Sequence, residues 1–130
     1  MRRTIGRVVL AVGLAASMLA AGSAANAKAG DVTKTGSCSA ASTWKLKLSS
    51  DAGQIQLEFE VDQNKVGQTW AVRVKQNGAR IFAGKRVTKA PSGSFTVRLF
   101  ADDTVGTDSF RVSAANAATG ESCVGRASIG

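Results

Sequence analysis

The stretch TWAVRVKQNGARIFAGKRV, residues 69–87, decides the fold. Large apolar side chains alternate with small or basic ones along residues 70–75, which is the period-two pattern of a half-buried strand. Asn77-Gly78 follows, a dipeptide typical of a tight type I′ turn because both central residues of that turn need positive φ. A second strand then returns through residues 81–87. The stretch therefore predicts a hairpin with Trp70 in the core of a β-sandwich.

Similar alternation recurs on both sides of this hairpin. Five further strands are predicted at residues 44–49, 54–62, 95–100, 109–115 and 122–129. Seven short antiparallel strands separated by turns are typical of an all-β, two-sheet sandwich of the immunoglobulin-like or fibronectin type III-like kind. We therefore predict one such domain over residues 43–130, preceded by a flexible lead-in over residues 28–42.

Residues 1–27 have the features of a cleaved signal peptide. Arg2, Arg3 and Arg7 precede an apolar run at residues 8–21, and Ala25-Asn26-Ala27 is an A-x-A cleavage site. The run is short for a membrane span, so a retained transmembrane helix is the less favoured alternative. We expect a secreted chain starting at Lys28, with the export route, Sec or twin-arginine, left open.

The mature chain would be basic and would contain two cysteines. The sequence has 17 Lys and Arg against 9 Asp and Glu, and removal of the three signal-peptide arginines leaves 14 against 9, or +5. Its 103 residues fit one domain, which buries about two-thirds of the surface of its unfolded chain. Because an even cysteine count in an exported chain favours pairing, we predict a Cys38–Cys123 disulfide that fastens the N-terminal segment to the last strand.

Several segments of the chain resemble a group of small secreted actinobacterial proteins. They are WKLKLS (44–49), EFEVDQN (58–64), residues 68–70, RVTKAPSGSFTVR (86–98) and TGESC (119–123). The resemblance spans Ser37 to about Arg126, nearly the whole predicted domain. It implies export and an Ig-like fold and supplies no active site.

The sequence argues against an enzyme. It has no histidine, so the usual Ser-His-Asp and Cys-His arrangements are excluded. Glu58 and Glu60 would lie about 6.5–7 Å apart on one strand face, a separation that glycosidase carboxylates use. The favoured interpretation is a solvated face on which these two glutamates pair with Lys45, Lys47 and Arg98.

No metal or other cofactor is predicted. The segment from Asp62 begins like a calcium-binding loop, but Val66 and Arg73 stand where ligands are needed. Asp102, Asp103 and Asp108 could gather around calcium at one end of the sandwich, although aspartates are commoner as plain turn formers. An aromatic carbohydrate platform is disfavoured because tyrosine is absent and Trp44 and Trp70 share the parity of core residues; Phe82 and Phe100 are expected to fold back over the core.

Charge gives the strongest functional signal. If residues 44–49, 54–62 and 95–100 form one sheet, its outer face is mixed and nearly neutral. The other sheet then carries basic side chains on its outer face with no acidic residue within the strands. These side chains are Arg73, Lys75, Arg111 and Arg126, with Lys85 or Arg86 alongside. A face of one sign attracts polyanions.

The leading hypothesis is a secreted, non-enzymatic binding or structural module that associates with anionic cell-envelope polymers or polysaccharides. Specific nucleic-acid recognition is not expected, because no exposed aromatic residues are interleaved with the basic ones. The alternatives are a small-molecule carrier with a hydrophobic cleft, a glycan hydrolase using Glu58 and Glu60, and an adhesive homodimer through a strand edge. The sequence leaves the natural partner and the oligomeric state open.

Overall fold

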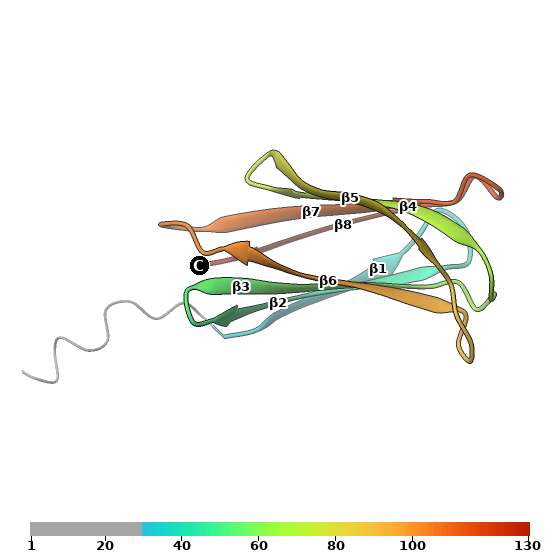
Figure 1. Ribbon diagram of the computed structural model, residues 1–130, viewed down its shortest axis with the longest axis horizontal. Helices are drawn as coiled ribbons and strands as arrows, with labels where there is room; N and C mark the ends of the chain where they lie inside the picture. Colours follow the sequence, from blue (N-terminus) through green and yellow to red (C-terminus); the bar gives the residue numbers. More distant parts are fainter. Residues whose placement is uncertain (1–29) are drawn as a thin grey trace, which may run out of the picture.

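The computed structural model describes residues 30–130, which form a β-sandwich of two four-stranded antiparallel sheets (Figure 1). The signal-peptide prediction and the Lys28 start lie outside these residues. One sheet has the order β1-β2-β3-β6 and the other β5-β4-β7-β8. The strands are β1 (Val32–Ser37), β2 (Thr43–Asp51), β3 (Gln54–Asp62), β4 (Thr69–Gln76), β5 (Ala79–Val87), β6 (Ser94–Asp102), β7 (Asp108–Ala115) and β8 (Ser122–Ile129). The predicted division of the strands between two sheets is confirmed.

The prediction of seven strands is wrong, because the structure has eight. The additional strand is β1, which lies within the segment predicted to be a flexible lead-in. It pairs with β2 over its whole length, from Val32 opposite Leu48 to Ser37 opposite Thr43. Its sequence, VTKTGS, has no apolar alternation because β1 is a mostly exposed edge strand, and Gly36 occupies a position where a side chain would point at Trp44.

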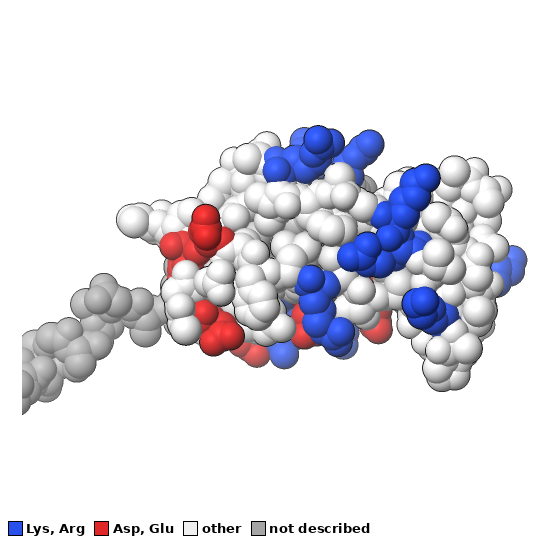
Figure 2. All heavy atoms as spheres, in the orientation of Figure 1, with Lys and Arg blue, Asp and Glu red and all other residues white. Residues whose placement is uncertain are grey.

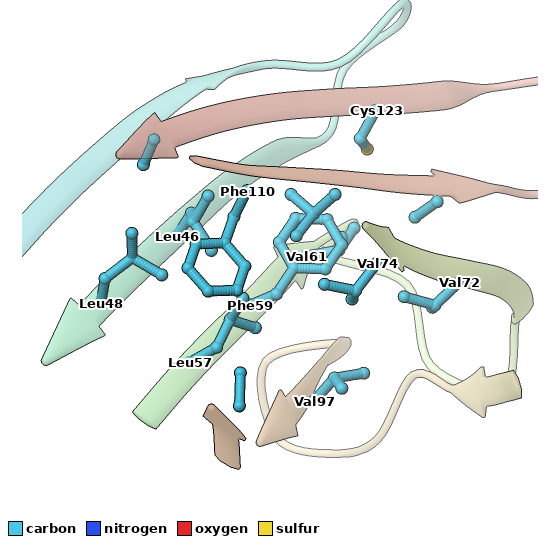
Figure 3. Packing of buried hydrophobic residues seen from close by; sticks show 14 of the residues in the cluster. Leu46, Leu48, Leu57, Phe59, Val61, Val72, Val74, Val97, Phe110 and Cys123 are labelled. Carbon is cyan, nitrogen blue, oxygen red and sulfur yellow. The ribbon is translucent and has the colours of Figure 1, made fainter. Parts of the chain in front are cut away.

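The core lies between the sheets, as the alternating pattern predicts. Inward apolar residues of β3 and β4 are fully buried, and Phe59 and Phe110 approach each other from opposite sheets at its centre (Figure 3). Trp70 is completely buried, and its indole N–H donates a hydrogen bond to Gln63 Oε1 at 2.9 Å. The ring of Phe95 lies 6.2 Å from that of Trp70, centroid to centroid.

Phe82 and Phe100 have different environments. Phe82 is partly buried and packs against the core, as expected. The expectation for Phe100 is wrong, since this side chain is 55% exposed. Phe100 pairs with Gln56 in the β3–β6 register, and this pairing places it on the outer face of its sheet.

The turn between β1 and β2 is fastened to β8 by covalent and polar contacts. Cys38 and Cys123 form a disulfide, which confirms the predicted pairing. Beside it, the buried carboxylate of Glu121 accepts hydrogen bonds from Ser42 Oγ at 2.7 Å, from Ser42 N–H at 2.9 Å and from Ala40 N–H at 3.1 Å. Burial raises the pKa of Glu121, but the hydrogen bonds from Ser42 and Ala40 outweigh it and leave this pKa below its usual value.

Candidate anion-binding face

The outer face of the β5-β4-β7-β8 sheet carries six basic side chains and no acidic one. We call these six residues the basic face: Arg73, Lys75, Arg80, Lys85, Arg111 and Arg126. All six are exposed, and none makes an ion pair with an acidic residue of the described part of the chain. In Figure 2, blue side chains stand along the top of the molecule above this sheet with no red among them. Five of the six residues predicted for this face lie on it: Arg73, Lys75, Lys85, Arg111 and Arg126.

The register of the strands aligns four of these cations in one line across the sheet. Arg80 on β5 lies opposite Lys75 on β4, Lys75 lies opposite Arg111 on β7, and Arg111 lies opposite Arg126 on β8. We call this line the basic row. Like charges directly opposite each other on neighbouring strands destabilise a sheet, so folding alone does not favour such a line.

A β-bulge in the central hairpin decides which basic residues of β5 join the face. Asn77 and Gly78 both have positive φ, as a type I′ turn requires, and the turn sets Lys75 opposite Arg80. The register then shifts between Val74 and Lys75, so Val74 lies opposite Phe82 and Ala71 lies opposite Lys85. Because of the extra residue, each side chain from Phe82 to Val87 points to the opposite side of the sheet from the one that an unbroken alternation would give. Phe82 therefore points toward the core.

Lys85 and Arg86 therefore point to opposite sides of the sheet. Lys85 shares the outer face with Arg73, whereas Arg86 lies outside the basic face. Its guanidinium carbon is 5.3 Å from the centroid of the Phe82 ring, and Nη1 donates a hydrogen bond to the Lys85 carbonyl at 2.8 Å. Lys85 and Arg86 are equivalent candidates in the sequence, and the bulge separates them.

Arg80 is the basic-face residue that the sequence analysis missed. Counting back from the two-residue Asn77-Gly78 turn would have placed it opposite Lys75.

A buried polar network holds the end of the sheet under the basic row. The Asp108 carboxylate is fully buried and accepts hydrogen bonds from Gln76 Nε2 and Asn77 Nδ2, both at 3.0 Å, and from Thr104 N–H and Oγ1. Asn77 Oδ1 in turn accepts a hydrogen bond from Ser109 N–H at 2.9 Å. These contacts fix the hairpin against the start of β7 and so fix Lys75 beside Arg111.

A shallow depression of about 420 Å³ lies beside the basic row, from Lys75 on β4 to Arg126 on β8. Lys75, Arg111 and Arg126 line it together with two hydroxyl side chains, Ser109 and Ser128. The two serine oxygens are 3.0 Å apart and both are exposed. The depression thus combines three cations with two neutral hydrogen-bonding groups.

The outer face of the other sheet has mixed charge, as the sequence predicts. Glu58 lies opposite both Lys47 and Arg98, and Glu60 lies opposite Lys45. Arg98 Nε is 3.4 Å from Glu58 Oε1. Glu58 is therefore engaged by basic neighbours, as expected for a solvated structural face.

The distribution of charge between the sheets is uneven. The strands of the β1-β2-β3-β6 sheet contain four basic and five acidic residues, whereas those of the β5-β4-β7-β8 sheet contain seven basic residues and one acidic residue, the buried Asp108. Because the acidic residues are concentrated elsewhere, the positive potential of the basic face is not cancelled by its own sheet.

Within residues 30–130, no three His, Cys, Asp or Glu side chains are grouped so that they could hold a metal ion. The same residues contain no helix long and apolar enough to cross a membrane. Comparison with protein-family models, with curated proteins and with solved structures finds no match to this chain.

Proposed function

We propose that this protein is a secreted, non-enzymatic module of the Ig-like kind that attaches to anionic polymers of the cell envelope through its basic face. The observation that carries the proposal is the exposure of six cations on one sheet face without an acidic partner. A cationic face of this kind raises the local concentration of polyanions and speeds their association.

The arrangement of the fold supports this role for the face. Its strands are paired by antiparallel ladders, and the polar network around Asp108 fixes the hairpin that carries Lys75 and Arg80. The opposite sheet balances its own charges, so a polyanion is directed to one side of the molecule. Binding through such a surface is electrostatic and weakens as salt increases.

Co-sedimentation of the mature protein with purified Gram-positive cell envelopes over a salt series tests the proposal. The test variant carries Arg73→Glu, Lys75→Glu and Arg111→Glu. The matched control carries Lys34→Glu, Lys65→Glu and Lys89→Glu, exposed residues outside the basic face, and so changes the net charge by the same amount. We expect the control to retain most of the binding and the test variant to lose it, with both still folded. Equal binding by the test variant and the unaltered protein would refute a role for the face.

A further inference from the structure

The basic row runs across the strands, from Arg80 through Lys75 and Arg111 to Arg126. This direction restricts the shape and the charge spacing of a ligand that can contact all four cations. We infer that the basic row is a binding track for a linear phosphodiester polymer whose repeats carry no aromatic ring, and that the polymer lies across the strands. This inference rests on the proposed function and specifies the class of polymer and the residues that bind it.

The geometry of the row sets how the polymer lies. Neighbouring strands of a sheet are about 4.8 Å apart, so four cations on four adjacent strands extend over roughly 14 Å. The line they form is perpendicular to the strands. A polymer with one charge on every repeat meets a cation at each of the four strands if it follows this line. If it runs along β4 instead, it meets only two cations, Lys75 and Arg73.

The chemistry of the row suits phosphodiesters. Three of its four residues are arginines, whose planar fork can donate two parallel hydrogen bonds to two oxygens of one phosphate. A phosphodiester has two unesterified oxygens that share one negative charge. Ser109 and Ser128 lie beside Arg111 and Arg126 in the same depression and share one hydrogen bond, which leaves one hydroxyl as a neutral donor for these oxygens.

The surroundings of the row exclude ring stacking as a source of affinity. The next positions along the outer face are Ala83, Arg73, Ser113 and Val124, and after these Lys85, Ala71, Ala115 and Ser122. Proteins that bind single-stranded nucleic acid combine a basic groove with aromatic side chains on which bases stack. The outward positions in these rows lack aromatic residues, so recognition is directed to the phosphate backbone and favours a polyol-phosphate chain.

Two double variants with the same change of charge test the track. Lys75→Gln with Arg111→Gln removes the two central cations of the row, and Arg73→Gln with Lys85→Gln removes two cations from the same face beside it. The probe is poly(glycerol phosphate), with its dissociation constant measured at several sodium chloride concentrations. Thermal unfolding of each variant confirms that it is folded.

We expect the row variant to lose about tenfold or more in affinity and the matched variant to lose markedly less. If four phosphates are bound, the slope of log K against log salt is about −2.8 for the unaltered protein and about −1.4 for the row variant, since a single-stranded polymer contributes about −0.7 per phosphate. The matched variant should keep a slope close to that of the unaltered protein.

The outcomes separate this inference from the proposed function. Equal losses in both double variants would overturn the track and leave a diffuse anion-binding face. No loss in either would remove both proposals. Equal or tighter binding of heparin or polygalacturonate would overturn the phosphodiester class, and tighter binding of single-stranded DNA with the same number of phosphates would overturn the polyol-phosphate assignment.

Discussion

The indole ring of Trp44 on β2 lies directly against Gly125 on β8, so closely that a Cβ atom at residue 125 would be 2.7 Å from Trp44 Cζ3. Gly36 on β1 flanks the same ring, and a Cβ atom there would also lie 2.7 Å from the indole. The ring thus occupies a slot between two glycines that belong to different sheets. This slot closes the sandwich along its β1 and β8 edge.

Gly125→Ala should destabilise the protein, because the added methyl group has to displace a packed indole ring. We expect the free energy of unfolding to fall by about 1–3 kcal/mol in denaturant titrations. Gly30→Ala is the matched control, since a Cβ atom at Gly30 would have nothing within 4 Å, and its effect should be small. An unchanged denaturation midpoint for Gly125→Ala would show that the Trp44 ring is not tightly packed against residue 125.

Glu121→Gln should remove an acid-sensitive part of the stability. The pKa of Glu121 is lowered in the folded state, so the carboxylate stabilises the fold above its unfolded pKa, and this contribution is lost as pH falls through the folded pKa. Near neutral pH we expect the variant to lose about 1–3 kcal/mol, because Ser42 and Ala40 lose a charged acceptor.

Unfolding curves of both proteins over a pH series from neutral to strongly acidic check this prediction. The difference between them should shrink as the pH falls below the unfolded pKa of a glutamate, about 4.3. A difference that stays constant over this range would contradict the role of the ionised carboxylate.

Replacing Cys38 and Cys123 together by serine should cost about 4.6 kcal/mol of stability, the value that the chain-entropy model gives for a sequence separation of 85 residues. The measurement is denaturant unfolding of the variant beside that of the unaltered protein, each with and without reductant. The variant should not respond to the reductant, whereas the unaltered protein should lose stability in its presence.

Lys75→Thr should stabilise the protein at low salt, because Lys75 lies between Arg80 and Arg111 and its removal relieves two like-charge contacts. We expect a gain of about 0.5–1 kcal/mol, which shrinks in about 1 M salt, where charges are screened within about 3 Å. Lys47→Thr is the control, since Lys47 lies opposite Glu58 and its ammonium is 3.5 Å from the Asp31 carboxylate. That variant should lose stability under the same conditions, and a gain in both variants would argue for a propensity effect of threonine.

The sequence alone predicts most of the sandwich because its inner positions are marked by strict alternation. In β3, the residues Ile55, Leu57, Phe59 and Val61 are buried while their neighbours are not, so the strand and its facing are both evident. The Asn77-Gly78 turn likewise identifies the central hairpin, because positive φ at both positions suits this dipeptide.

The remaining features depend on contacts between distant residues. β1 has no alternation of its own and is a strand because β2 offers it a free edge. Whether Lys85 or Arg86 points to the outer face depends on a bulge that has no clear signature in residues 79–82. The slot around Trp44 requires glycines from two other strands. Charge signs are readable from the sequence, but their alignment into a row depends on the register of three strand pairs.

The disulfide closes the segment from Cys38 to Cys123 into a covalent ring. Every loop that connects consecutive strands from β2 to β7 lies within this ring. A protease that cuts an exposed turn within it, such as Ala52-Gly53 between β2 and β3, adds one water molecule but releases no fragment. We expect the nicked molecule to stay in one piece, with both sheets still paired and the basic row still in line. Under proteolytic attack, the first cut would leave the basic face whole, and the fragments would separate only after reduction and unfolding.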